Sequence, residues 1–154
     1  MTNYRSVHVE LGDRSYPVEI GSGITHRVHE HLPATARKVA IVTQENIGIE
    51  LDTGIEQRVF TIGDGEAYKT IETVGELCRA WAQWGLNRND VVIGLGGGIV
   101  TDVAGFAAAV FHRGLPVVQV ATTLLGQVDA AIGGKTGVNL PEGCLLYTSP
   151  SPRD

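Results

Sequence analysis

The feature that most limits the fold is a block at residues 90–110, where an apolar run, three glycines and an alanine-rich segment follow one another. Residues 91–95 have almost no polar face, which is typical of a strand buried on both sides of a parallel sheet. The glycines at 96–98 let the backbone approach a ligand closely. Residues 99–111 predict a helix, whose first N–H groups favour anions. The block therefore predicts a strand–turn–helix unit, either as a tight turn without a ligand or as the site of a dinucleotide pyrophosphate.

The rest of the chain repeats this alternation of strands and helices. Compact apolar runs predict strands, and apolar residues at helical spacing predict helices with one buried stripe. The expected elements are strands at 38–43, 57–62 and 116–120 and helices at 66–84 and 124–132, with a turn at 87–90 and a loop at 133–137. Strands that alternate with helices indicate a parallel sheet covered on both faces. We therefore expect an α/β fold, a Rossmann-like parallel sheet with flanking helices.

The first residues predict a separate N-terminal β-hairpin. Apolar residues alternate with polar ones at 7–11 and 16–20, on either side of the turn-forming residues 12–15. A short helix is expected at 24–32, where it ends before Pro33. The hairpin and this helix come before the first strand of the expected sheet.

Composition excludes several classes of protein. With 43% apolar and 19% charged residues, the chain is a soluble globular protein rather than a disordered one. No apolar run approaches the roughly 18 residues of a membrane helix, and the first residues lack the apolar core of a signal peptide. A net charge of −5 without a lysine–arginine stripe argues against a nucleic-acid partner. The two cysteines cannot build a disulfide framework, so we expect a cytoplasmic protein that binds neither membranes nor nucleic acids.

The segment 144–154 differs in composition from the chain before it. Pro150 and Pro152 alternate with serines, a pattern that holds neither a helix nor a central strand. Reverse translation of the segment gives a string that resembles a transposon-type sequencing-library adapter read through in frame. We therefore expect residues 1–143 to form an incomplete α/β domain and residues 144–154 to be a non-native tail.

Several polar residues stand where ligands bind in sheets of this kind. Asp102 lies one turn into the expected helix, where a carboxylate either caps the helix dipole or accepts hydrogen bonds from a ligand. Glu66 and Lys69 have the spacing of a solvated ion pair, which would also let both side chains meet a ribose. Thr122 and Thr123 end a buried strand, either as caps or as ligand contacts.

Three charged residues are further candidates for ligand binding. Asp129 falls on the helix expected at 124–132, and Lys135 stands on a loop framed by glycines. A lysine in such a loop can contact a phosphate or a carboxylate, although a lone loop lysine is more often solvated. Arg113, which precedes a glycine, has the same two interpretations.

Three histidines on the short helix at 24–32 could suggest a metal site. They are His26, His29 and His31. Their spacing is not that of a metal-binding cluster and no cysteine accompanies them, so we interpret them as an exposed helix face. No residue of the chain is assigned to a metal.

The order of these motifs resembles that of the 3-dehydroquinate synthases, the NAD-dependent cyclases of the shikimate pathway. The matching blocks are DGEAYK at 64–69, GLGGGIVTDVAGF at 94–106, RG at 113–114, QVATTLLGQVD at 119–129 and IGGKTGVN at 132–139. The resemblance is continuous from about residue 64 to residue 143 and looser before it. Several long motifs in one order are far more specific than any one of them.

The resemblance implies a role for each matching residue. Segment 64–69 would contact the adenosine ribose of NAD, and the glycine turn would hold the pyrophosphate. Asp129 and Lys135 would be catalytic and substrate-binding residues between cofactor and substrate, and Arg113 would bind the substrate phosphate. The implied cofactor-binding residues are Asn46, Asp64, Gly65, Glu66, Lys69, Gly97, Gly98, Asp102, Thr122, Thr123 and Lys135.

The resemblance also implies a reaction. The intact protein would convert 3-deoxy-D-arabino-heptulosonate 7-phosphate to 3-dehydroquinate and phosphate through a transient NAD-dependent oxidation, as a homodimer with zinc or cobalt. The metal ligands of the family, a glutamate and two histidines, belong to a helical C-terminal domain, and an active-site Lys-Asn pair follows the position of Gly143. The sequence has neither, so we expect an inactive fragment of such an enzyme.

Two other functions are compatible with the same residues. The first is a related enzyme, either another NAD-dependent sugar-phosphate cyclase or a glycerol-dehydrogenase-like oxidoreductase, which shares the glycine turn. The second is a non-catalytic nucleotide-binding module. Binding of NAD without turnover of the heptulosonate phosphate would favour the module.

Overall fold

The computed structural model describes residues 4–143 and 145–147, and its centre is a four-stranded parallel sheet. The strands are β3 (Lys38–Thr43), β4 (Glu56–Thr61), β5 (Val91–Gly96) and β6 (Val117–Ala121), in the order β4-β3-β5-β6. Each lies within one residue of its expected position. The structure therefore confirms the predicted α/β fold with a Rossmann-like parallel sheet.

The central strand β5 is buried along its whole length, as its sequence predicts. Successive side chains of a strand point to opposite faces. Val92 accordingly packs into the core on one face, while Val91, Ile93 and Leu95 pack into the core on the other. Gly94 of β5 is paired with Gln119 of β6, and a Cβ atom on Gly94 would meet the Gln119 side chain.

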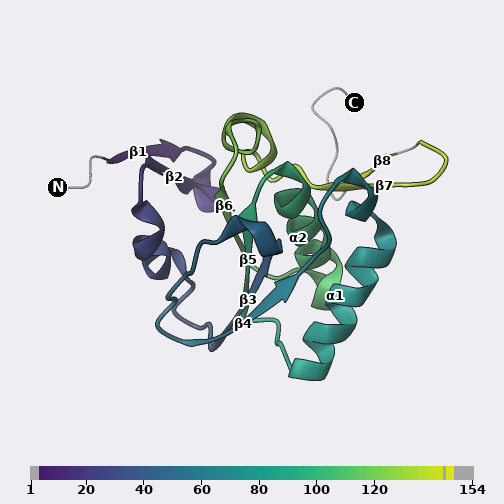
Figure 1. Ribbon diagram of the computed structural model, residues 1–154. Helices are drawn as coiled ribbons and strands as arrows, with labels where there is room; N and C mark the ends of the chain where they lie inside the picture. The colour runs from purple at the N-terminus through teal and green to yellow at the C-terminus, as the bar shows by residue number, and fades with distance from the viewer. Residues whose placement is uncertain (1–3, 144, 148–154) are drawn as a thin grey trace.

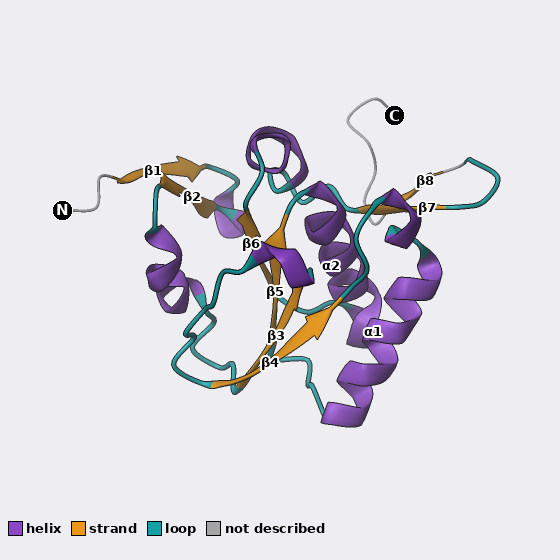
Figure 2. Cartoon of the chain, in the orientation of Figure 1, coloured by secondary structure: helices purple, strands orange, loops and turns teal. Residues whose placement is uncertain are grey.

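The two faces of the sheet are covered by different kinds of structure (Figures 1 and 2). The α-helices α1 (Ile71–Trp84) and α2 (Gly98–Val110) cover one face, where the fully buried Trp81 belongs to the core. The other face is covered by the 3₁₀ helix η2 (Ile24–His31), through Val28, and by the segment that includes Leu51. Both faces are covered, as predicted, but only one of them by the described α-helices.

The predicted helix at 66–84 is divided in two. A short 3₁₀ helix, η4 (Glu66–Tyr68), comes first, and α1 begins at Ile71. The division falls at Thr70, whose extended backbone and side-chain oxygen, 3.3 Å from the N–H of Thr73, cap the helix. The helices expected at 24–32 and 124–132 also depart from α geometry: the first is the 3₁₀ helix η2, and the second contains the π-helix η6 (Gly126–Ala130).

Two small antiparallel sheets flank the central one. The predicted hairpin is β1 (Tyr4–Val9) and β2 (Tyr16–Gly21), joined through η1 (Gly12–Arg14). Strand β7 (Gly137–Asn139) pairs with β8 (Leu145–Tyr147). Residues 145–147 of the expected tail therefore form a strand, while residues 144 and 148–154 lie outside the described part. The non-native origin of the tail stays a prediction. None of the described helices is long and apolar enough to cross a membrane.

Candidate cofactor site

Strand β5 and helix α2 meet at three glycines that leave the first turn of α2 open. Gly97 is the N-cap residue, and no side chain of the described residues caps the helix. Backbone pairing within α2 starts at Thr101, whose N–H donates to the carbonyl of Gly97 over 3.0 Å. The preceding N–H groups are therefore available to an anion, together with the positive end of the helix dipole.

Lack of space, rather than backbone conformation, requires glycine at this turn. A Cβ atom on Gly96 would lie 2.6 Å from Cγ2 of Val100, and one on Gly97 would lie 3.1 Å from Cγ2 of Thr123. The turn lies at the carboxyl ends of the parallel strands, where ligands bind in open α/β sheets. This arrangement would suit a pyrophosphate, and the pyrophosphate site stays a prediction.

Lys69 joins the segment before α1 to the second turn of α2. Its Nζ lies 2.5 Å from Oδ2 of Asp102 and 3.9 Å from Oε1 of Glu66, and the Lys69 and Asp102 side chains are 14% and 17% exposed. Burial raises the pKa of Asp102, and the neighbouring Lys69 ammonium partly offsets this increase. Asn139 completes the group: its side chain donates to Oε1 of Glu66 over 2.7 Å, and its N–H to the carbonyl of Lys69 over 2.8 Å. We call these four residues the Lys69 network.

Asn46 and Asp64 meet where the neighbouring strands β3 and β4 end. The Asn46 side chain donates to one carboxylate oxygen of Asp64 over 3.5 Å, and the buried Gln44 donates to the other over 3.3 Å. Gln44 also donates to the carbonyl of Gly63. Gly65 follows with a φ of +96°, so the backbone turns sharply into η4. The structure thus brings two predicted cofactor-side residues together from loops that are about 18 positions apart in sequence.

Thr122 and Thr123 lie against the glycine turn. The N–H of Thr122 donates to the carbonyl of Gly96 over 2.9 Å. The hydroxyl of Thr123 accepts from the N–H of Gly126 over 3.1 Å, so it caps the helical segment that follows. A Cβ atom on Gly126 would lie 3.6 Å from the backbone nitrogen of Gly98, which places this segment beside the start of α2.

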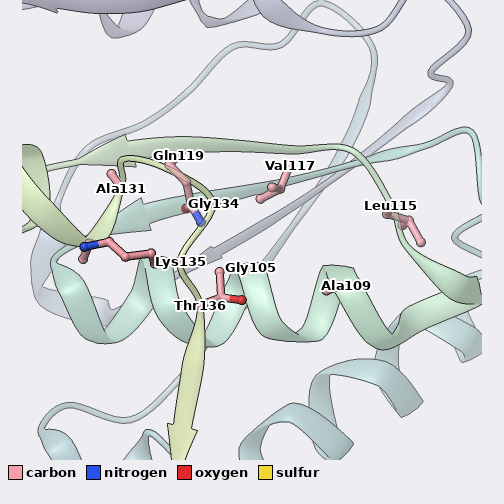
Figure 3. A pocket seen from close by; sticks show the side chains of 10 residues that line it. Gly105, Ala109, Leu115, Val117, Gln119, Ala131, Gly134, Lys135 and Thr136 are labelled. Carbon is pink, nitrogen blue, oxygen red and sulfur yellow. The ribbon is translucent and has the colours of Figure 1, made fainter. Parts of the chain in front are cut away.

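Asp129 and Lys135 form an ion pair on the exposed side of the site. Their side chains are 58% and 53% exposed. Lys135 also lines a pocket of about 150 Å³ between α2, β6 and the loop that carries it, with Gly105 and Thr136 in its wall (Figure 3). The pocket runs along α2 and its lining does not include the glycine turn, so the two features are neighbours rather than one cavity.

Arg113 lies at the opposite end of α2. It belongs to η5 (Phe111–Arg113), directly after the helix, which has 13 residues and is therefore about 20 Å long. His112 and Arg113 both have positive φ angles, of 48° and 67°, which are uncommon for residues other than glycine. Among the described residues, the structure shows no hydrogen bond or ion pair that joins Arg113 to Asp129 or Lys135.

The three histidines of η2 have partners of their own. Ring nitrogens of His26 and His29 lie within hydrogen-bonding distance of the carbonyls of Gly23 and His26, and His31 lies 3.5 Å from a Glu19 oxygen. Among residues 4–143 and 145–147, no group of three or more histidine, cysteine or acidic side chains could hold a metal ion. The described residues therefore fit a dinucleotide, through the open start of α2 and the polar side chains beside it.

Comparisons with known proteins agree with this arrangement. A family description for the N-terminal part of 3-dehydroquinate synthases matches residues 59–146. A protein of Amycolatopsis mediterranei (strain S699), provisionally named an aminodehydroquinate synthase, is 45% identical over 150 residues, which are 95% of this chain and 43% of that protein. The 3-dehydroquinate synthase of Prochlorococcus marinus (strain AS9601) is 41% identical over 154 aligned positions, covering 92% of this chain and 42% of that enzyme.

Solved structures share the same fold. A 2-deoxy-scyllo-inosose synthase, solved with carbaglucose-6-phosphate, NAD⁺ and Co²⁺, superposes with a TM-score of 0.79 over 93% of this chain and 42% of that chain, at 23% identity. The 2-epi-5-epi-valiolone synthase of Streptomyces hygroscopicus, solved with NAD⁺ and Zn²⁺, gives a TM-score of 0.63 over 75% of this chain and 36% of that chain, at 34% identity. The chain thus spans less than half the length of these proteins. From its motifs, its fold and these matches, the chain belongs to the 3-dehydroquinate synthase family, of which it represents the N-terminal part.

Proposed function

We propose that this chain forms the NAD-binding part of a cyclase that converts 3-deoxy-D-arabino-heptulosonate 7-phosphate to 3-dehydroquinate and phosphate. The open first turn of α2, with the Lys69–Asp102 pair beside it, is the observation that carries the proposal. The presence of NAD⁺ in the 2-epi-5-epi-valiolone synthase, which is 34% identical, supports the choice of cofactor. NAD would supply the acceptor for a hydride from a substrate hydroxyl and later return that hydride, without net redox change.

The residues around α2 would each hold one part of the cofactor. The N–H groups at Gly97 and Gly98 would donate to the pyrophosphate, since no described side chain takes their place at the helix start. Asp64 and Glu66 present carboxylate oxygens that can accept from ribose hydroxyls. Lys69 would hold Glu66 and Asp102 in place, because its ammonium lies between their carboxylates.

Lys135 and Asp129 would act on the substrate side. The Lys135 ammonium would donate hydrogen bonds to an anionic or carbonyl oxygen of the substrate, and Asp129 would orient that ammonium through their ion pair. Both side chains are more than half exposed, so their contribution depends on how water is excluded once the substrate is bound. Because no group of three or more histidine, cysteine or acidic side chains gathers among the described residues, we propose no metal site formed by them alone.

We propose that Arg113 contacts the substrate phosphate only in a homodimer, where it would reach the site of the other subunit. Within one chain, the length of α2 separates Arg113 from the glycine turn. A second copy of the chain would have to bring its own Arg113 to the substrate. An arginine at this distance would then bind the phosphate of the neighbouring site rather than of its own.

A second candidate is a cyclase with a different carbocyclic product. The 2-epi-5-epi-valiolone synthase shares 34% identity with this chain, and the two family relatives described above carry the names of different synthases. The residues that hold NAD would be the same for either reaction. The substrate that is turned over decides between the two candidates.

The test uses a full-length protein that carries residues 1–143, supplied with NAD⁺, Zn²⁺ and the heptulosonate phosphate. We expect one phosphate released for each 3-dehydroquinate formed, with no net NADH. Turnover only of another sugar phosphate would replace this substrate by that of a related cyclase. Binding of NAD⁺ without turnover of any sugar phosphate would reduce the proposal to a nucleotide-binding module.

A further inference from the structure

The loop that carries Lys135 is tied to the N-terminal hairpin by a contact between residues far apart in the sequence. The N–H of Gly133 donates to the phenolic oxygen of Tyr16, 3.1 Å away and 117 residues earlier. Tyr16 is the first residue of β2, and in Figure 1 the hairpin lies next to the segment that contains η6. The hairpin, which takes no part in the central sheet, thus reaches the loop two residues before Lys135.

The other end of the loop is fixed inside the fold. Thr136 is 8% exposed and packs against α2 at Gly105, where a Cβ atom would overlap the Thr136 methyl group. Figure 3 shows Thr136 and Gly105 side by side beneath Lys135. Lys135 therefore stands next to a buried residue on one side and close to the Tyr16 contact on the other.

The glycines that precede Lys135 have open surroundings. Gly133 and Gly134 have φ angles of +81° and +67°, and no atom lies within 4 Å of the place where a Cβ atom would stand on either. Glycines in open surroundings have a wide range of accessible backbone conformations. Without the hydrogen bond to Tyr16, the interaction that the described residues still offer to this part of the loop, besides backbone contacts, is the exposed ion pair of Lys135 with Asp129.

We propose that Tyr16 is a positioning residue. Through Tyr16, the N-terminal hairpin would hold the loop in the conformation in which Lys135 pairs with Asp129. The proposal rests on the substrate-side role proposed above for Lys135. If Tyr16 only stabilised the fold, its removal would speed up amide hydrogen exchange throughout the chain. If Tyr16 positions the loop, its removal would speed up exchange at residues 131–136 and leave the exchange rates of the central sheet unchanged.

The test compares Tyr16→Phe with Tyr4→Phe in the complete chain. Both remove one phenolic oxygen from the hairpin, but Tyr4 faces the Arg27 guanidinium, 4.0 Å from its ring centre, instead of the loop. Hydrogen exchange is followed residue by residue. We expect the Gly133 amide of Tyr16→Phe to exchange about two- to tenfold faster, the range that one net hydrogen bond supports, with amides of β3 and β5 unchanged. Tyr4→Phe should leave Gly133 unchanged.

Acylation of the Lys135 amine gives a second readout that needs neither NAD nor substrate. The Asp129→Asn variant gives the acylation rate of Lys135 without its carboxylate partner. We expect the acylation rate of Lys135 in Tyr16→Phe to lie between that rate and the rate of the parent protein. An unchanged rate at Lys135, or faster exchange at Gly133 only in proportion to β3 and β5, would overturn the positioning role. If these changes occur but the intact protein turns over no sugar phosphate, the proposed function fails while the role of Tyr16 in holding the loop stands.

Discussion

Two glycine-rich turns of this chain use glycine for opposite physical reasons. At Gly96 and Gly97, the backbone is not in the left-handed region, and a Cβ atom would come within 2.6 Å and 3.1 Å of neighbouring side chains. At Gly133 and Gly134, both φ angles are positive and the space for a Cβ atom is empty to 4 Å. The first turn therefore needs glycine for room, and the second needs it for its backbone conformation.

This difference matches what each turn would do. A turn packed on all sides keeps its N–H groups in one place, which suits a site that binds a cofactor by its backbone. An open turn can adopt several conformations and needs outside contacts to hold a charged side chain in place. Tyr16 and the Gly105–Thr136 contact supply them for Lys135. Substitutions in the two turns should accordingly have different consequences.

The largest effect is expected from Lys135→Ala in a full-length protein that carries this sequence. Turnover should fall by about 10² to 10⁴, the usual range for loss of a group that acts on the reacting atoms. The dissociation constant for NAD⁺ should change little, because the pocket that Lys135 lines does not include the glycine turn in its lining. Steady-state kinetics and calorimetric titration measure the two quantities. Equal losses in both would refute a role between cofactor and substrate.

Asp102→Ala should mainly weaken the binding of NAD⁺. The loss of a carboxylate that accepts from the ligand is worth about 1.5–3 kcal/mol, or about ten- to a hundredfold in affinity. Asp13→Ala, in the turn of the hairpin, is the matched control and should leave affinity unchanged. The Asp102→Ala substitution also removes the carboxylate that pairs with Lys69 at 2.5 Å. Circular dichroism therefore checks that this variant is still folded. An unchanged affinity would limit the role of Asp102 to its ion pair with Lys69.

Gly96→Ala tests the need for room in the first turn. The added methyl would press on Val100, whose χ1 is restricted in a helix, so we expect a loss of about 1–3 kcal/mol in the free energy of unfolding. Gly75→Ala is the control inside α1, where the nearest atom is the end of Arg79 at 3.8 Å. That variant should be more stable by about 0.5–1 kcal/mol. Urea denaturation measures both free energies of unfolding. An equal change for Gly96→Ala and Gly75→Ala would contradict the claim that the first turn needs glycine for room.

The smallest effect is expected from Gly134→Ala in the second turn. A left-handed conformation costs an alanine about 1–2 kcal/mol, and the loop can relax because nothing packs on it. Gly134→Asn should lose less, since asparagine tolerates this conformation better. Thermal denaturation of both variants measures the difference. An alanine variant as stable as the parent protein would show that the loop does not keep this conformation in solution.

The sequence was sufficient for features that depend on residues close together in the chain. The alternation of apolar and polar residues predicted the hairpin, and the apolar runs predicted all four strands of the central sheet to within one residue. The division of the helix at 66–84 was not predicted, because its apolar spacing continues through Lys69 and Thr70. The cap at Thr70 decides the boundary, and threonine occurs inside helices as well as at their starts.

The parts of the candidate site that sequence reasoning missed are contacts over long distances in the chain. Lys69 and Asp102 were each proposed for NAD, but nothing in their spacing indicates that they pair with each other. Asn139 and Gln44 had no proposed role, although the first lies in a recognised motif and both bond to predicted site residues. Asp90 was read as part of a turn, whereas its buried carboxylate accepts from the N–H groups of Arg37 and Lys38 and joins β3 to the start of β5.

The measurement that tests the central claim most directly is a titration of the chain with NAD⁺, followed by the amide resonances of each residue. The open start of α2 predicts the largest shifts at Gly97, Gly98 and Asp102, with smaller ones at Thr122 and Thr123 and none at Arg113. Shifts confined to other parts of the chain, or no shift at Gly97 and Gly98 at saturating NAD⁺, would contradict the assignment of this turn as the cofactor site.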